Sequence, residues 1–275
     1  IINFLGREGL PFIAIKCTGL LDIDSLEKIS SGEYTYDSKE YVSFKKRLVD
    51  LCDSAVRNNV QVLIDAEETW IQDAIDNVAI ELMQIYNIKS SVIFLTHQCY
   101  RTGTLSKIKK NLEVSKEKKY FYGIKLVRGA YMEKERNRAL QKSYTSPIQI
   151  SKLSTDKEYN ESLKYSIENI DRASLWIGSH NEESSLYLIN LMNDNNLRPQ
   201  DKRIWLSQLY GMSDNISYAL SSLGYNIVKL IPFGPIDKTI PYLIRRANEN
   251  SSVKGQSNRQ FTLIKKEINR RKNLN

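Results

Sequence analysis

Two adjacent arginines and a cluster of carboxylates are the residues whose types and spacing most directly suggest chemistry. Arg245 and Arg246 stand in "PYLIRRANEN", which has the character of the first turns of a helix. Helix neighbours point about 100° apart, so at least one guanidinium must face something other than open solvent. In "DAEE", Asp65, Glu67 and Glu68 follow an apolar run, and cations, shared protons or a helix dipole must offset their repulsion. The cluster fits a metal site, a general acid or base, or a helix start.

Cations also stand within or directly after apolar runs, where a charge is costly unless it is paired. Lys16 ends one run and could either be paired or reach solvent, and Lys125 and Arg128 lie in "IKLVRGAY". Gly129 then allows a close approach to the backbone. His180, in "SHN", is by itself more typical of a hydrogen-bonded structural imidazole than of a ligand. We interpret the set as a site for an anion-rich, planar or phosphate-bearing ligand.

Seven short apolar runs must position these residues. They are rich in β-branched and aromatic residues, and they cover residues 12–17, 60–65, 91–96, 122–127, 174–179, 204–209 and 226–231. Amphipathic helical patterns lie between them, for example at 40–59 and 70–86. This alternation predicts an α/β fold with a parallel sheet. Neither GxGxxG nor GxxxxGK occurs, which disfavours an open dinucleotide-binding sheet.

Segments that are polar or contain glycine follow every run, as expected at the active face of a closed (βα)8, TIM-like barrel. Seven runs are one short of eight, and the sequence does not begin with Met. We therefore expect the first strand and helix to lie upstream, and we take residues 1–275 as a single, amino-terminally truncated barrel domain. Residues 143–160 are the longest irregular stretch, which we expect to be a functional excursion.

Composition narrows the class of protein further. The sequence is 41% hydrophobic, and no apolar run approaches the roughly 20 residues that span a bilayer. Three scattered cysteines predict a reducing compartment, and two histidines leave so few ligands that we predict no metal site. The net charge is +8, with lysines concentrated in 106–120 and 264–275 among apolar residues at helical spacing. Such tracts are typical of solvated helix faces.

Five motifs, in this order and spacing, strongly resemble those of proline dehydrogenases. Their sequences are more similar to the monofunctional forms than to the long bifunctional ones. They are "VLIDAEETW", "KLVRGAYMEKER", "SHNEESS", "QLYGMSDNIS" and "PYLIRRANENSSV". The likeness runs from about residue 10 to residue 270. It implies a distorted (βα)8 barrel that holds FAD at the carboxyl ends of the strands, with the last helix over the barrel mouth.

The resemblance also implies roles for individual residues. The catalytic residues would be Asp65 and Lys125, with Lys125 directed at the flavin N5 region. The substrate carboxylate would be held by Lys16, Arg245 and Arg246, and the proline ring pocket shaped by Tyr131, Leu209 and Tyr242. FAD would be bound by Ala66, Gln98, Arg128, Gly129, Ala130, Ser179, His180, Asn181, Gln208 and Glu249.

The expected reaction is the FAD-dependent oxidation of L-proline to Δ1-pyrroline-5-carboxylate, the first step of proline catabolism, with electrons passed to a quinone. We expect a cytoplasmic protein with weak peripheral contact to the inner membrane if it is bacterial, or one on the mitochondrial matrix side if it is eukaryotic. No nucleic acid is expected as a partner.

Two departures from the family pattern leave alternatives open. Leu230 stands where many members carry Tyr, which suggests a dehydrogenase of hydroxyproline or another proline analogue. Lys125 stands where many carry Arg, which keeps the charge but changes the hydrogen-bond geometry. An alternative of another class, motivated by the +8 charge, is a basic protein that binds nucleic acid or a membrane surface.

Overall fold

The computed structural model describes residues 1–237, 239–240, 243–244, 265–266 and 268–272. The chain divides into two compact units, Ile1–Lys229 and Leu230–Asn275. The predicted residues Tyr242, Arg245, Arg246 and Glu249, and with them the expected helix over the barrel mouth, lie outside the described residues. Among the described residues of the second unit, 236–237, 239–240, 243–244, 265–266 and 268–272 are helical.

Within the described residues, seven strands form one sheet whose order in space follows their order in the chain. They are β1 (Phe12–Ile15), β2 (Gln61–Ile64), β3 (Ile93–Gln98), β4 (Tyr122–Val127), β5 (Ala173–Gly178), β6 (Ile204–Leu209) and β7 (Ile227–Leu230). The pairs from β1 to β6 are parallel. Parallel neighbours require a crossover between them, and these crossovers are helical. The predicted α/β fold with a parallel sheet is confirmed.

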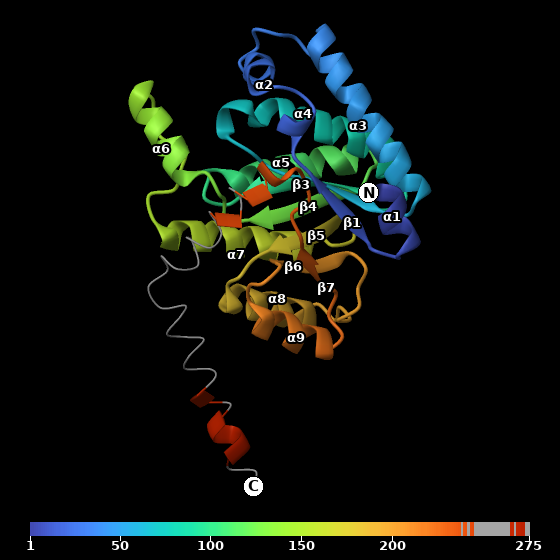
Figure 1. Cartoon of the computed structure of the whole chain (residues 1–275), viewed down its shortest axis with the longest axis vertical. Helices are drawn as coiled ribbons and strands as arrows, with labels where there is room; N and C mark the ends of the chain where they lie inside the picture. The colour runs from blue at the N-terminus through green and yellow to red at the C-terminus, as the bar shows by residue number, and fades with distance from the viewer. Residues whose placement is uncertain (238, 241–242, 245–264, 267, 273–275) are drawn as a thin grey trace. The chain divides into compact units, whose positions relative to one another are not determined.

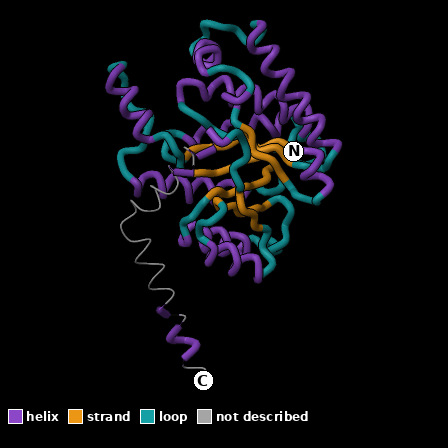
Figure 2. Tube along the Cα trace, in the orientation of Figure 1, coloured by secondary structure: helices purple, strands orange, loops and turns teal. Residues whose placement is uncertain are grey.

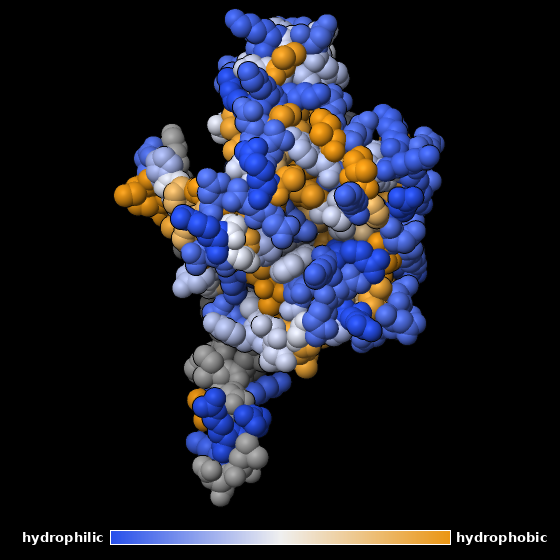
Figure 3. Space-filling view, turned by 90° about the vertical axis from the view of Figure 1, so that its right-hand side faces the viewer, coloured by the Kyte–Doolittle hydropathy of each residue, from blue (hydrophilic) through white to orange (hydrophobic). Residues whose placement is uncertain are grey.

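Helices connect and cover the strands (Figure 1). They are α1 (Ile2–Arg7), the 3-10 turn η1 (Cys17–Gly19), α2 (Ile23–Ser30), α3 (Lys39–Arg57), α4 (Thr69–Tyr86), α5 (Thr104–Glu117), α6 (Met132–Gln141), α7 (Lys152–Glu168), α8 (Glu182–Asp194) and α9 (Asp214–Ser222). The strands gather at the centre of the first unit with helices outside them (Figure 2). The face in Figure 3 is mostly hydrophilic, with hydrophobic residues in small groups.

The sheet is curled, as contacts between distant strands demonstrate. The rings of Phe12 on β1 and Trp176 on β5 have centroids 4.3 Å apart, although four strand spacings in a flat sheet would separate them by roughly 19 Å. Trp176 also donates to the Gln61 side chain on β2 at 3.3 Å and stacks on Trp205 of β6 at 5.3 Å. Trp176, Leu63 and Phe94 are buried inside this curl, so the interior is packed in the manner of a barrel.

Short polar residues start several helices where the sequence supplies a capping side chain. Asp22, Ser38, Ser151 and Asn181 each accept a hydrogen bond from a backbone N–H in the first turn of α2, α3, α7 and α8. Because α7 begins at Lys152, the irregular stretch predicted for residues 143–160 is wrong over its second half. The buried face of α7 includes hydroxyl side chains, which weakened its apolar pattern in the sequence. In the part of the chain that the structure describes, no helix is both long and apolar enough to cross a bilayer.

Buried His97 makes the stability of the fold sensitive to mild acid. Its Nε2 lies 2.9 Å from the Tyr122 hydroxyl, which also accepts from Asn111 at 2.9 Å. Burial, and then the charges of Lys107 and Arg101, lower the pKa of His97 to about 3. The folded protein therefore keeps His97 neutral, whereas the unfolded chain takes up a proton below about pH 6.5.

We expect the free energy of unfolding to fall as the pH drops from about 6.5 to 5, by up to about 1.4 kcal/mol per pH unit from His97 alone. Urea unfolding of the wild type and of His97→Gln, measured across this range, checks the effect. Glutamine can keep the contact with Tyr122 but does not titrate, so its profile should be flatter. Equal slopes for the two proteins would contradict the assignment.

Candidate functional site

A partly buried ion pair joins the residue directly after β2 to a residue in the second half of β4. Lys125 Nζ lies 2.5 Å from Asp65 Oδ1, with 8% and 21% of the two side chains exposed. Lys125 is paired in register with Thr96 on β3 and Trp176 on β5, so its strand lies between two others that line the same interior. Alternation along β4 directs Lys125 to the face opposite that of Leu126. The two residues expected to be catalytic are therefore brought together.

A second contact joins the ends of β1 and β4. Lys16 follows β1 directly, and its ammonium donates to the Tyr131 hydroxyl at 2.8 Å. Desolvation lowers the pKa of Lys16, but Tyr131 and Asp65 raise it by more, so the pKa lies above its ordinary value. Lys16 is therefore cationic at neutral pH, as an anion-binding residue must be.

The three carboxylates of "DAEE" each have a different partner. Asp65 pairs with Lys125, and Glu67 accepts from the backbone N–H of Thr18 at 3.0 Å and from its hydroxyl at 2.6 Å. Glu68 precedes α4 as its N-cap residue and pairs with Lys134. Ala66 is buried between them. The cluster ties neighbouring loops together at the start of a helix.

Gln98 extends this framework to the loop after β4. Its side-chain amide donates to the Glu67 carbonyl at 2.7 Å, and its oxygen accepts weakly from the Ala130 N–H at 3.4 Å. Gly129, before Ala130, has φ 131°, and a Cβ there would lie 2.5 Å from the ring of Tyr100. Glycine is therefore required at this position by the Tyr100 side chain as well as by its backbone conformation.

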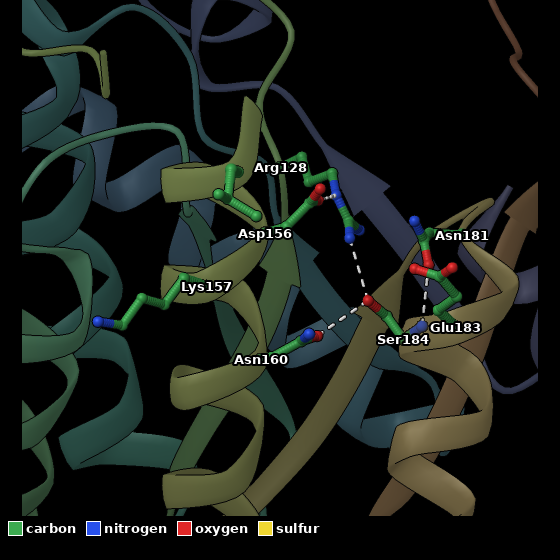
Figure 4. A pocket seen from close by; sticks show the side chains of 8 residues that line it. Arg128, Asp156, Lys157, Asn160, Asn181, Glu183 and Ser184 are labelled. Carbon is green, nitrogen blue, oxygen red and sulfur yellow. Dashed lines mark hydrogen bonds and ion pairs between the residues drawn. The ribbon is translucent and has the colours of Figure 1, made fainter. Parts of the chain in front are cut away.

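Arg128 is held on several sides at a second part of the site (Figure 4). Its Nε donates to Asp156 of α7 at 2.6 Å, and its terminal nitrogens donate to Ser179 and Ser184, each at 3.0 Å. The guanidinium also lies over the Tyr159 ring, 4.4 Å from its centroid. Among the described residues these contacts leave one N–H on each terminal nitrogen for a ligand.

A pocket of about 250 Å³ opens beside Arg128, between α7 and the start of α8. Asn181 caps α8 by accepting from the Ser184 N–H at 2.9 Å, so the positive end of this helix faces the pocket. Desolvation raises the pKa of Asp156, but hydrogen bonds from Lys152 and Arg128 lower it by more, so its pKa lies below the ordinary value. Two cations neutralise Asp156, but the lining also contains the Glu183 carboxylate, so an anion such as a diphosphate would have to be bound by Arg128, Lys157 and the start of α8.

The ends of β5 and β6 meet through His180. Its Nδ1 lies 3.0 Å from the Ser213 hydroxyl, and its Nε2 is 3.5 Å from the Leu209 N–H. Gln208 donates to the Ser179 carbonyl at 3.3 Å and accepts from Ser217 at 2.9 Å. Gln208 therefore links the ends of β5 and β6 to α9. The resemblance implied that this residue also binds the cofactor.

Several residues that complete the site were not predicted. Asp156, Tyr159 and Ser184 surround Arg128, and Thr18 and Glu135 hold neighbouring loops. Ser184 stood in a quoted motif three residues after Asn181, the spacing of a helix cap, and this signal could have identified it. Asp156 and Glu135 had no comparable local signal, because their partners lie 28 and 66 residues away.

A curled parallel sheet with charged residues gathered at the carboxyl ends of its strands defines this protein as a βα-barrel with a candidate active site. A family model described as proline dehydrogenase matches residues 18–259. The chain belongs to the proline dehydrogenase family.

Relatives agree with this assignment. Proline dehydrogenase 1, mitochondrial, of Caenorhabditis elegans is 35% identical over 252 residues, which cover 90% of this chain and 41% of the relative. Hydroxyproline dehydrogenase of Xenopus laevis is 36% identical over 230 residues, which cover 82% of this chain and 49% of the relative. The chain thus spans less than half the length of either protein.

Solved structures support the barrel fold. Proline utilization A (PutA) from Bdellovibrio bacteriovorus aligns with a TM-score of 0.80 over 92% of this chain and 27% of that chain. Its sequence identity is 20%, so this likeness concerns the fold alone. The predicted TIM-like architecture is confirmed.

Replacing Gly129 by alanine should destabilise the protein by about 1–3 kcal/mol more than replacing Gly32, because only the first Cβ meets a neighbouring ring. Gly32 also has a positive φ, of 81°, but has open space around it, so Gly32→Ala controls for backbone strain. Chemical unfolding measures the difference. In a Tyr100→Ala background the excess should shrink, and an unchanged excess would exclude Tyr100 as its cause.

Proposed function

We propose that this protein oxidises L-proline to Δ1-pyrroline-5-carboxylate with FAD as cofactor. The observation that carries the proposal is the partly buried Lys125–Asp65 pair, together with the Lys16–Tyr131 contact. Family membership supplies the reaction class, and the relatives' names supply the substrate. The reaction removes a hydride from the ring carbon beside the nitrogen and a proton from the amine.

The residues around Arg128 fit the diphosphate of FAD. Its two remaining N–H groups and the start of α8 face the same polar pocket. We propose that Arg128, Ser179 and Asn181 hold this part of FAD, and that Ala66, Gln98, Gly129, Ala130, His180, Gln208 and Glu249 line the rest of its site. FAD, when bound, supplies the flavin N5 that accepts the hydride.

The cationic residues have complementary tasks in this proposal. Lys16, with its raised pKa, binds the substrate carboxylate together with Arg245 and Arg246, and two or three cations on one carboxylate fix the angle of the ring. Tyr131, Leu209 and Tyr242 bound the ring itself.

Asp65 acts as an electrostatic organiser in this scheme. Its carboxylate holds the Lys125 ammonium at 2.5 Å, in an interior where a lysine side chain would otherwise sample several rotamers. A fixed ammonium beside the flavin favours the negative charge that develops when the hydride is transferred. Asp65 therefore contributes through the position of Lys125 and needs no proton transfer of its own.

Purified, FAD-loaded protein should be yellow and should bleach when L-proline is added without oxygen. Lys125→Met should lower kcat/KM for proline by about 100-fold, because it removes a charge directed at the developing anion. Anaerobic stopped-flow absorbance measures both effects.

Lys110→Met, on the exposed face of α5, is the matched control and should behave as the wild type. Failure of proline to reduce the folded, FAD-loaded wild type at any concentration would overturn the proposed substrate. Equal kcat/KM values for the Lys125 and Lys110 variants would overturn the role of Lys125.

A second candidate function is the oxidation of hydroxyproline, which the Xenopus laevis relative and Leu230 favour. Leu230 ends β7, and Val228, two residues earlier, packs against the interior cluster. Because residues two apart on a strand share a face, Leu230 is directed to the interior at the strand ends. Leucine leaves room that a tyrosine phenol would fill.

Leu230→Tyr should lower kcat/KM for hydroxyproline by about tenfold relative to that for proline, since it crowds a ring hydroxyl. Steady-state turnover of both substrates measures the ratio. Leu223→Tyr, at an exposed position after α9, is the control. A ratio that does not change in the Leu230 variant would show that Leu230 does not select the substrate.

We also propose a membrane quinone as electron acceptor, reached through weak peripheral docking. The described tail residues Lys265, Lys266, Arg270, Arg271 and Lys272 are exposed and helical, which supports attraction to an anionic membrane surface. By likeness to relatives that are named mitochondrial, the matrix side is the proposed location in a eukaryote, and the cytoplasm in a bacterium.

A further inference from the structure

We infer that Glu135 is a positioning residue that, by clamping Thr69, fixes Tyr131 and through it the substrate-binding ammonium of Lys16. This inference rests on the proposed function, since it assigns Glu135 a task in binding proline. None of the sequence motifs singled out Glu135 for a role, and its side chain does not line the ion pair or the Arg128 pocket.

Glu135 lies in the first turn of α6 and is fully buried, with 0% of its surface exposed. Its carboxylate accepts two hydrogen bonds of 2.6 Å from Thr69, one from the backbone N–H and one from the hydroxyl. Thr69 is the first residue of α4, an 18-residue helix, so the carboxylate also lies at the positive end of that helix. These interactions offset the cost of burying the charge.

The Glu135–Thr69 contact fixes the position of Tyr131 through the backbone of α6. Tyr131 is the N-cap residue of this helix, and its carbonyl accepts from the Glu135 N–H at 2.9 Å. Fixing Glu135 against α4 therefore fixes the first turn of α6, and with it the Tyr131 hydroxyl that accepts from Lys16 at 2.8 Å.

Lys16, the other partner of the Lys16–Tyr131 contact, is held by the same kind of carboxylate–threonine interaction. Glu67 takes both the N–H and the hydroxyl of Thr18, in the η1 turn that begins directly after Lys16. Lys16 and Tyr131 are thus each clamped, by a bidentate carboxylate–threonine contact, against residues 67–69. Asp65, in the same short segment, holds Lys125.

Glu135 does not serve as the ion-pair partner of the neighbouring cations of α6. The neighbouring cations of α6 have other partners, since Lys134 pairs with Glu68 and Arg138 with Glu27. Both cations also lie over the ring of Trp70, the second residue of α4. The Glu135 carboxylate instead specifies one register of α6 on α4, which its hydrogen-bond geometry fixes more narrowly than an apolar contact would.

The experiment compares flavin-loaded Glu135→Ala with Glu133→Ala, an exposed glutamate in the same helical turn. We expect Glu135→Ala to raise the KM for proline by about tenfold with kcat changed less than about threefold, since it weakens binding in the ground state and transition state alike. Glu133→Ala should match the wild type. Glu135→Gln and Thr69→Ser can re-form both hydrogen bonds and should restore KM to within about threefold of the wild type, whereas Thr69→Val should not.

A double-mutant cycle with Lys16→Met separates positioning from general destabilisation. If Glu135 acts through Tyr131 and Lys16, adding Glu135→Ala to Lys16→Met should raise KM by much less than tenfold. Full additivity, or a Glu135→Ala variant with the KM of Glu133→Ala, would overturn the inference. Absence of flavin reduction by proline in the wild type would instead overturn the proposed function, so the two failures are distinguishable.

Discussion

The Lys125–Asp65 ion pair links two strands that are not neighbours in the sheet, and the rest of the site is arranged around it. The two residues belong to strands separated by β3, which in a flat sheet would stand roughly 10 Å apart. The long Lys125 side chain reaches across β3 and meets Asp65 at 2.5 Å. Because an unpaired charge there would be costly, the pair also penalises any arrangement of the strands that separates β2 from β4.

The loop after β2 serves as the common anchor of the other strand ends. Within residues 65–69 it contacts the end of β1 through Glu67, β3 through the Glu67 carbonyl, β4 through Asp65, and α6 through Glu68 and Thr69. Most of these contacts involve a carboxylate, whose two oxygens each accept more than one hydrogen bond. Each charge of this dense acidic motif has its own donor, which offsets the repulsion between the carboxylates.

Much of the fold could be predicted from the sequence, and the site only in part. The ranges of β4 and β6 agree with the apolar runs because parallel strands covered on both faces are continuous apolar segments. The start of α7 was missed, since its first buried residues, Thr155 and Tyr159, both carry hydroxyl groups and give no clear apolar pattern. The sequence indicated which strand ends carry charge, but it did not indicate that Lys125 selects Asp65 or that Arg128 selects Asp156. The partners in these two pairs are 60 and 28 residues apart in the sequence, and local sequence patterns do not predict such pairings.

The contact between Lys16 and Tyr131 closes a loop of 115 residues. Loop closure of that length carries a large entropic cost, which only contacts already made within the loop can reduce. The first four strands and the helices between them must therefore be in place before this contact is stable. The Lys16–Tyr131 arrangement, to which we assign substrate binding, therefore also depends on the contacts that hold Glu135 of α6 to Thr69 of α4, and paired strands alone do not provide it.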